Sequence, residues 1–202
     1  MFDEFREECG LIGVWNHPEA ANLAYLGLYA QQHRGQEGAG VVSLDRTETS
    51  PQYHVHKGHG LVADVFGDFD FTRLPGKSAI GHFRYTTAGG HLLANVQPHF
   101  AEVSCGRVAL AHNGNLIDVD SLRQELIQVG AIFGTSSDTE VILHLLARGQ
   151  KNVPLHEVVI SALEQINGAF SLLMLFDDRM FAVRDRNGVR PLALGRLDGA
   201  YV

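Results

Sequence analysis

Apolar residues along this chain gather in short runs bounded by turn residues, a pattern typical of buried strands. Several runs follow one another through short turns instead of crossover helices, which favours antiparallel sheets over a doubly wound parallel sheet. The predicted strands are "CGLIGVW" (9–15), "AGVVSL" (39–44), "SAIGHFRY" (78–85), "RVALAH" (107–112), "AFSLLMLF" (169–176) and "RMFAVRD" (179–185).

Other segments carry apolar residues at helical spacing and predict helices. They cover residues 19–33, 118–130, 137–149 and 155–168. Ser137 and Glu140 have the spacing of a capping box, which places Asp138 in the first turn of its helix. The pattern therefore predicts an α+β fold with helices outside two sheets. A further strand begins in "DGAYV" (198–202), so we expect the natural chain to continue past Val202.

Composition narrows the classes of function. A length of 202 residues suits one substantial domain, and 45% apolar with 19% charged residues is ordinary for a globular protein. The formal net charge of −7 argues against a nucleic-acid-binding protein. No run approaches the roughly 20 apolar residues of a membrane span, and the acidic leader does not resemble a secretion signal. With Cys9 and Cys105 as the two cysteines, a reducing cytoplasm is the expected compartment.

Cys9 can be interpreted in two ways. In the apolar run "CGLIGVW" it could be a small buried residue. Alternatively, removal of residues 1–8 would leave Cys9 with a free α-amino group beside its thiol. An α-amino group titrates near ~7.7–8.0 and could serve as the base that a thiol of pKa ~8.5 requires.

Two arginines stand in glycine-containing segments. Arg34 lies in "QHRGQEGAG" (32–40), which could be a helix stop with a flexible connection or could hold a positive partner for a thiolate or a carboxylate. Arg84 lies in "GHFRYTTAGG" (81–90), at a predicted strand end before a glycine-containing loop. It could be a surface arginine at a turn, or its planar guanidinium could bind a substrate carboxylate bidentately under a closing loop.

The segment "LAHNGNL" (110–116) also allows two interpretations. Asn113 followed by Gly114 could form a type I′ hairpin turn. Directly after an apolar strand, the same pair could instead offer a side-chain amide and a backbone N–H, the two donors that an oxyanion hole requires. Asp138 could likewise cap a helix or receive a substrate ammonium group.

Taken together and in order, "CGLIGVW", "QHRGQEGAG", "GHFRYTTAGG", "LAHNGNL" and "SSDTE" resemble the motifs of class II glutamine amidotransferases. Those proteins are N-terminal-nucleophile (Ntn) hydrolases, so the resemblance implies a four-layer αββα sandwich. "HGLVADVF" (59–66) and "RDRNGVRPLALG" (184–195) extend the similarity over nearly the whole chain and are most similar to the amidophosphoribosyltransferase branch.

The resemblance implies a role for each matching residue. Cys9, freed by loss of the propeptide 1–8, would be the nucleophile of a glutaminase domain over 9–202. Asn113 and the N–H of Gly114 would form the oxyanion hole. Glutamine would be bound by its two charged ends and by a loop starting at Arg84: Arg84 on the carboxylate, Asp138 on the ammonium, with Arg34, Tyr85 and Thr86 in support.

In this branch, ammonia released through a cysteine thioester converts phosphoribosyl pyrophosphate into 5-phosphoribosylamine, the first committed step of purine biosynthesis. The phosphoribosyltransferase domain is absent from this chain. We therefore expect no cofactor here, because Mg and the 4Fe-4S cluster of some members belong to that domain. A homo-oligomer is expected at full length, without a nucleic acid or membrane partner. The alternatives are a glutaminase domain serving another acceptor, such as a sugar phosphate, and an inert unprocessed Ntn module.

Some features favour structural interpretations. His54, His56 and His59 form "HVHKGH", which could suggest a metal site, but the run has no neighbouring carboxylate or cysteine. Cys105 lies in a predicted hairpin, "AEVSCGRV" (101–108), and is expected to be a small packing residue.

Overall fold

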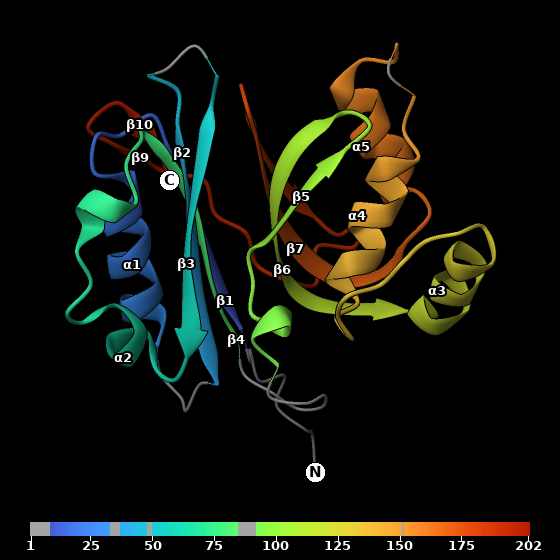
Figure 1. Cartoon of the computed structure of the whole chain (residues 1–202), viewed down its shortest axis with the longest axis horizontal. Helices are drawn as coiled ribbons and strands as arrows, with labels where there is room; N and C mark the ends of the chain where they lie inside the picture. The colour runs from blue at the N-terminus through green and yellow to red at the C-terminus, as the bar shows by residue number, and fades with distance from the viewer. Residues whose placement is uncertain (1–8, 33–36, 48–49, 85–91, 151) are drawn as a thin grey trace.

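Two sheets pack face to face, and helices cover the outer face of each (Figure 1). The computed structural model describes residues 9–32, 37–47, 50–84, 92–150 and 152–202. All neighbouring strands are antiparallel. The predicted α+β sandwich of four layers is therefore confirmed.

The larger sheet has the order β3-β2-β4-β1-β10-β9, and the smaller has the order β5-β6-β7-β8. The six strands of the larger sheet are β1 (Gly10–Trp15), β2 (Gly38–Asp45), β3 (Gln52–His59), β4 (Ser78–Arg84), β9 (Arg196–Leu197) and β10 (Ala200–Tyr201). The four strands of the smaller sheet are β5 (His99–Val103), β6 (Gly106–Ile117), β7 (Asn167–Phe176) and β8 (Met180–Arg184).

Helices lie on both sides of this sandwich (Figure 1). The larger sheet carries α1 (Ala20–Gln31) and α2 (Val62–Phe66). The smaller sheet carries α3 (Val119–Gln128), α4 (Thr139–Ala147) and α5 (Leu155–Leu163). Short 3₁₀ turns occupy Phe71–Arg73 and Leu93–Asn95. Each predicted helix is present, but α5 ends before residue 168 because β7 begins at Asn167, where it pairs with Ile117.

Strand β3 was not among the strands predicted from the apolar runs. It forms one edge of the larger sheet, and its residues are half-buried or exposed. An edge strand that borders solvent does not need an apolar run. Its polar sequence "QYHVHKGH" therefore lacks the signal that identified the central strands.

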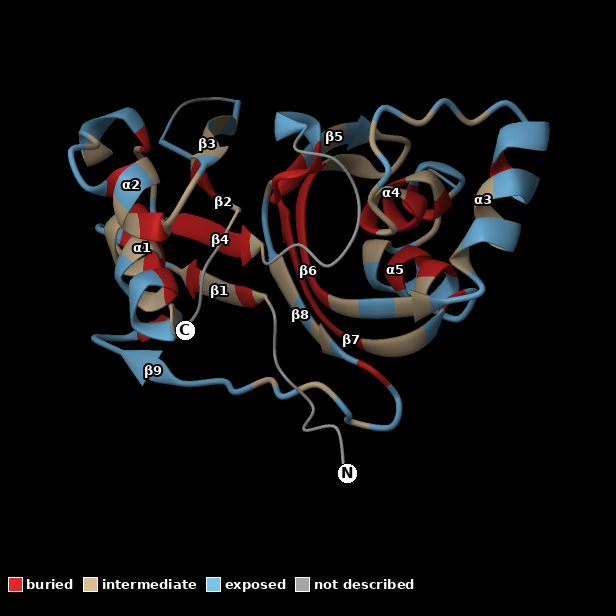
Figure 2. Ribbon diagram, turned by 90° about the horizontal axis from the view of Figure 1, so that it is seen from below, coloured by how far each residue is buried: buried red, intermediate tan, exposed pale blue. Residues whose placement is uncertain are grey.

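Three apolar clusters fill the spaces between the layers. One lies between the larger sheet and α1 and α2, and another lies between the smaller sheet and α3, α4 and α5. The third lies between the two sheets and includes Val42, Ile80, Ala109, Ala111 and Leu173. Buried strand residues therefore stand on both faces of each sheet, as the colouring of Figure 2 shows for β4 and β6. This explains why the central strands appear in the sequence as continuous apolar runs.

The start of α4 differs in detail from the predicted capping box. Ser137 Oγ accepts a hydrogen bond from the N–H of Thr139 (3.3 Å). The Glu140 carboxylate reaches back to the N–H groups of Gly134 and Thr135, at 2.8 Å each. The helix therefore begins at Thr139, and Asp138 is the residue just before it rather than part of its first turn.

Candidate active site

Cys9 lies just ahead of β1, the strand beside β4 in the larger sheet. Gly10 pairs with Phe83 of β4, so one further step in this antiparallel register brings Cys9 opposite Arg84. Both residues are half-buried. The pairing of two strands far apart in sequence therefore places the predicted nucleophile and the predicted carboxylate-binding arginine at the same end of the sheet.

Asn113 and Gly114 lie inside β6, not in a turn, and they pair with Ser171 and Phe170 of β7. The hairpin-turn interpretation is therefore excluded. Alternate residues of a strand face opposite sides of its sheet. Ala109 and Ala111 of β6 belong to the cluster between the sheets, and Asn113, which is 7% exposed, continues the same face.

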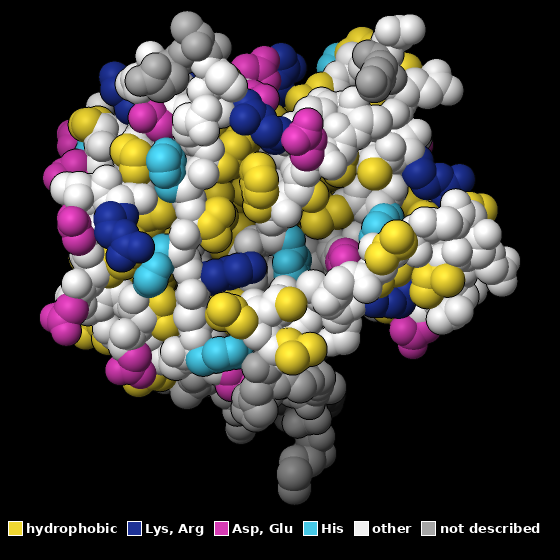
Figure 3. Space-filling view, viewed as in Figure 1, with side chains coloured by type: hydrophobic (Ala, Val, Ile, Leu, Met, Phe, Trp, Pro, Cys, Tyr) yellow, Lys and Arg dark blue, Asp and Glu magenta, His cyan; other side chains and the backbone are white. Residues whose placement is uncertain are grey.

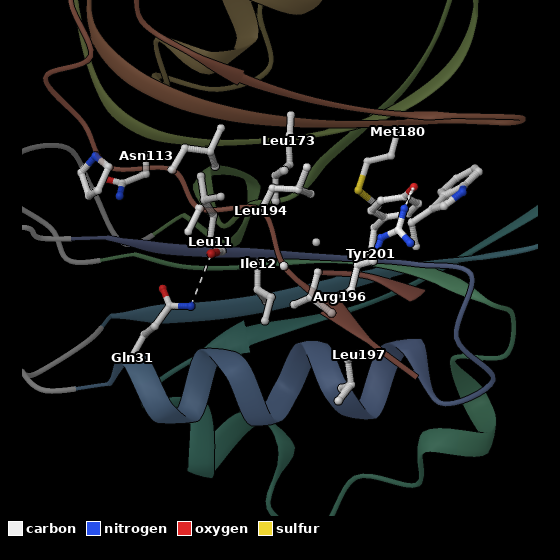
Figure 4. A pocket seen from close by; sticks show the side chains of 18 of the residues that line it. Leu11, Ile12, Gln31, Asn113, Leu173, Met180, Leu194, Arg196, Leu197 and Tyr201 are labelled. Atoms are coloured by element: carbon white, nitrogen blue, oxygen red, sulfur yellow. Dashed lines mark hydrogen bonds between the residues drawn. The ribbon is translucent and has the colours of Figure 1, made fainter. Parts of the chain in front are cut away.

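Cys9 and Asn113 line the same cavity, which has a volume of about 1000 Å³. Leu11 and Gln31 line it as well, and the Gln31 side chain donates a hydrogen bond to the Leu11 carbonyl (3.4 Å). Asn113 lies at one end, whereas Met180 and Tyr201 lie at the other (Figure 4). The cavity thus extends between the two sheets from the position of the predicted nucleophile.

One wall of this cavity is the connection from β8 to β9, an exposed segment that passes from the smaller to the larger sheet (Figure 2). Asp185 fixes the start of the connection, because its carboxylate accepts hydrogen bonds from the N–H groups of Asn187, Val189 and Arg190 (3.0–3.1 Å). Ser171 Oγ then donates to the Pro191 carbonyl (3.0 Å). These contacts hold residues 191–195 against the cavity.

Strand β5 begins at His99, short of the oxyanion candidates, and among the described residues no strand borders positions 112–116 of β6 on that side, here called the open edge. The ladder between β5 and β6 begins with His99 opposite Leu110. Beyond it, the His112 N–H donates to Gln97 Oε1 (2.7 Å), and the Leu116 N–H donates to Asp138 Oδ2 (3.3 Å). Because N–H directions alternate along a strand, we expect the Gly114 N–H at this same edge, between those two.

Asp138 lies beside this open edge from the start of α4. Its other oxygen, Oδ1, is 3.4 Å from His112 Nδ1. Burial raises the pKa of Asp138, but the hydrogen bond and charge of His112 and the N–H of Leu116 outweigh burial and hold the pKa below its ordinary value. The side chain is 27% exposed, so an ionised carboxylate is available there.

Gly114 adopts a conformation that disfavours other residues. Its φ is 144°, and a Cβ atom at this position would lie 2.0 Å from the Ala169 carbonyl oxygen. A side chain would therefore clash with the backbone of β7 and displace the strand. The glycine allows β6 to run past β7 while its N–H stays on the open edge.

The structure places some of the predicted site residues around one cavity, places others outside it, and does not describe the remainder. Cys9 and Asn113 share the cavity, whereas Arg84, Gly114 and Asp138 do not line it. Arg84 is at the Cys9 end of β4, and Asp138 is at the open edge of β6. Arg34, Tyr85, Thr86 and the propeptide 1–8 lie outside the described residues.

Sequence reasoning gave no role to a set of buried polar residues near the site. His82, Gln97, His99 and His112 are each at most 7% exposed. Two of them stand inside the quoted motifs, His82 in "GHFRYTTAGG" and His112 in "LAHNGNL". A histidine inside an otherwise apolar run was the feature of the sequence that could have identified His82 and His112 as buried polar residues. Basic and histidine side chains are visible beside apolar ones in the gap between the sheets (Figure 3).

Of the histidines of "HVHKGH", His56 contributes to packing, whereas His59 is exposed. His56 Nε2 lies 3.0 Å from the Val65 carbonyl oxygen, and its ring stacks on Phe69. Within the described residues, no group of three or more His, Cys, Asp or Glu side chains could hold a metal ion. The expectation that this chain itself needs no cofactor stays a prediction. None of the described helices combines the length and apolar character needed to cross a membrane.

Two antiparallel sheets between helical layers, with Cys9 and Asn113 lining one cavity between the sheets, define the fold class as that of the Ntn hydrolases. Residues 87–202 match the family described as glutamine amidotransferase domain. This match covers more than half of the chain, and the chain belongs to that family.

Its relatives are amidophosphoribosyltransferases. The chain is 46% identical over 200 residues to amidophosphoribosyltransferase 3, chloroplastic, of Arabidopsis thaliana, and 45% identical over 197 residues to the amidophosphoribosyltransferase of Bacillus subtilis. These alignments cover 99% and 97% of this chain but 37% and 40% of the relatives. The solved glutamine phosphoribosylpyrophosphate amidotransferase of B. subtilis superimposes with a TM-score of 0.85 at 41% identity, covering 95% of this chain and 40% of that one.

Proposed function

We propose that this chain is the glutaminase part of an amidophosphoribosyltransferase. It would release ammonia from glutamine through a cysteine thioester for the synthesis of 5-phosphoribosylamine from phosphoribosyl pyrophosphate, the first committed step of purine biosynthesis. The observation that carries the proposal is the shared cavity of Cys9 and Asn113. Relatives over 97–99% of the chain support it. The phosphoribosyl step would belong to sequence outside these 202 residues.

The chemistry begins with removal of residues 1–8. In the precursor, the Cys9 nitrogen is an amide and has no basic lone pair. In the processed chain, the free α-amino group takes the thiol proton, and the thiolate attacks the γ-carbonyl carbon of glutamine. The Asn113 side-chain amide and the Gly114 N–H would stabilise the oxyanion of the tetrahedral intermediate.

Collapse of that intermediate breaks the carbon–nitrogen bond. The α-ammonium group of Cys9 returns its proton to the leaving nitrogen, which departs as ammonia, and an acyl thioester remains on the sulfur. Water, activated by the same amine, then attacks the thioester and releases glutamate and the free thiol. No other reactant is needed for this half-reaction.

Glutamine would be recognised by two charged side chains, one negative and one positive, near Asn113 and Cys9. The ionised Asp138 carboxylate at the open edge of β6 would receive the glutamine ammonium group. Arg84, at the Cys9 end of β4, would bind the α-carboxylate bidentately. Arg34, Tyr85 and Thr86 would complete the binding site. The opposite charges at the two positions match an amino acid and not a simple amide.

Two measurements on purified protein test the glutaminase proposal. Intact mass reports whether residues 1–8 are removed, and glutamate release from glutamine reports activity. We expect active molecules to begin at Cys9 and Cys9→Ser to fold but lose hydrolysis, because a hydroxyl with only an amine as base is a poorer nucleophile. Substantial hydrolysis by Cys9→Ser, or full activity with the leader retained, would contradict the proposal.

The acceptor is tested on the full-length natural protein. We expect glutamine-dependent formation of phosphoribosylamine when phosphoribosyl pyrophosphate is supplied. Fructose 6-phosphate, a sugar phosphate, is the control acceptor. Amination of fructose 6-phosphate with no reaction of phosphoribosyl pyrophosphate would reject the proposed pathway step and leave the glutaminase assignment intact.

A further inference from the structure

The backbone N–H and carbonyl of His112 are held by side chains on the side of β6 that faces away from β7. Because β5 pairs with β6 only up to Leu110, no strand among the described residues pairs with His112 at the open edge. Gln97 Oε1 accepts its N–H at 2.7 Å, and His82 Nε2 lies 3.1 Å from its carbonyl oxygen. Two side chains thus make the hydrogen bonds that a neighbouring strand would otherwise make, immediately before the predicted oxyanion residue.

His82 makes this contact across the two sheets. It lies on β4 of the larger sheet, whereas His112 lies on β6 of the smaller sheet. Ile80, two residues earlier on β4, belongs to the apolar cluster between the sheets, so His82 faces the same space. His82 is fully buried, which gives the contact no competition from water.

The chemistry of the contact defines the proton position. A carbonyl oxygen only accepts hydrogen bonds, so His82 must carry a proton on Nε2. Burial, followed by the charges of His112 and His99, lowers the pKa of His82 to about 3, so the ring is neutral and its Nδ1 bears a lone pair. Within the described part of the chain, Nδ1 has no hydrogen-bond partner. Among the described residues, the His82 side chain therefore makes one hydrogen bond, from Nε2 to the His112 carbonyl oxygen.

The His112 side chain extends the same assembly to the substrate-binding carboxylate. Its Nδ1 lies 3.2 Å from Thr139 Oγ1 and 3.4 Å from Asp138 Oδ1. Arg84 follows His82 by two residues on β4. A single buried connection therefore joins the strand carrying Arg84, the peptide preceding Asn113, and the carboxylate of Asp138.

We propose that His82 is a positioning residue for the oxyanion hole: its Nε2–H holds the His112 carbonyl and thereby sets the direction of Asn113 toward Cys9. The inference rests on the proposed glutaminase function. Without the bond, the His112 carbonyl loses its partner and the backbone ahead of Asn113 can shift, although Asn113 stays paired with Ser171 of β7. Such a shift would move the Asn113 side chain away from the position at which charge develops. A small displacement of a catalytic group can cost up to about 100-fold in rate.

Paired substitutions test this role on the processed protein. In His82→Gln, the amide nitrogen can occupy the place of Nε2 and restore the bond. In His82→Asn, the shorter side chain places its amide nitrogen where Nδ1 of the histidine would be, too far away to bond to the His112 carbonyl. We expect kcat for glutamine hydrolysis to fall at least about tenfold in His82→Asn and to stay within about threefold of wild type in His82→Gln. KM should change less than kcat in both.

Controls separate positioning from loss of structure. Intact mass gives the fraction of molecules that begin at Cys9, circular dichroism reports whether each variant is folded, and kcat is normalised to the processed, folded fraction. His99→Asn is the matched variant, because His99 is also buried, at 6% exposure, whereas the His112 N–H and carbonyl bond to Gln97 and His82 among the described residues. We expect its normalised kcat to equal that of wild type.

The outcomes are distinguishable. Equal normalised kcat for His82→Asn and His82→Gln would overturn the inference, as would an equal loss in His99→Asn. Absence of glutaminase activity in processed wild-type protein would instead reject the proposed function. A tenfold or larger difference between the Asn and Gln variants, with unchanged intact mass and circular dichroism, supports positioning by the Nε2 hydrogen bond.

Discussion

Lowering the pH from 7.5 to 5.0 should destabilise the folded chain through two buried histidines. Burial, followed by the charges of His112 and His99, lowers the pKa of His82 to about 3. Burial, followed by the charge of Lys57, lowers the pKa of His99 to about 4. In the unfolded chain both rings have an ordinary pKa near ~6.5. Below that pH the unfolded state binds two protons that the folded state excludes, so the free energy of unfolding falls as the pH falls.

The magnitude follows from the separation of the pKa values. At pH 5.0 the unfolded state has gained about 2 kcal/mol for each histidine relative to pH 7.5, or about 4 kcal/mol for the pair. Because pH 5.0 lies above both folded-state values, the loss depends little on those values. Asp138 and Glu140 act at lower pH: their pKa values are depressed, so the stability they contribute is lost only below the ordinary carboxylate range near ~4.

Urea unfolding at pH 7.5, 6.0 and 5.0, followed by circular dichroism, measures this loss. His82→Gln and His99→Gln each remove one titrating ring, so each variant should lose about 2 kcal/mol less than wild type between pH 7.5 and 5.0. His156→Gln, at an exposed position of α5, is the control and should behave as wild type. If His99→Gln lost as much stability as wild type over this interval, the reasoning from burial would be wrong.

Further predictions concern the site. Asn113→Ala should lower kcat for glutamine hydrolysis by roughly 10²–10³-fold, for one lost oxyanion donor; unchanged turnover would remove Asn113 from the oxyanion hole. Arg84→Ala and Asp138→Ala should mainly raise KM for glutamine, since each leaves one charged end of the substrate unpaired; a pure kcat loss would contradict these roles. Gly114→Ala should abolish activity and lower the unfolding midpoint, because its Cβ would lie 2.0 Å from the Ala169 carbonyl oxygen; a variant as stable and active as wild type would exclude the strain. A precursor whose leader cannot be cleaved should fold with no glutaminase activity, since the amide nitrogen of Cys9 has no proton-accepting lone pair.

The central strands, the helices and the motif residues could be predicted from the sequence. Strands β1, β2, β4 and β7 carry apolar residues on both faces, because one face packs on helices and the other on the second sheet, so they stand out as continuous runs. The edge strand β3 borders solvent and carries no such run. Helix α5 ends earlier than its apolar pattern because pairing of Asn167 with Ile117 begins β7. Tertiary pairing outweighed local propensity at that boundary.

The assembly of the site depends on the pairing of strands that are far apart in the sequence, which the sequence does not reveal. Asn113 and Gly114 are a favoured dipeptide for a hairpin turn, and local propensity cannot distinguish a turn from the interior of β6; ten paired positions with β7 decide it. Similarly, nothing in the spacing of His82, Gln97 and His112 indicates that they meet. They meet because β5 begins only at His99, opposite Leu110, so that no strand in the described part of the chain covers the edge of β6 beyond it. A buried backbone N–H and carbonyl must be hydrogen-bonded, and side chains from two other segments satisfy them.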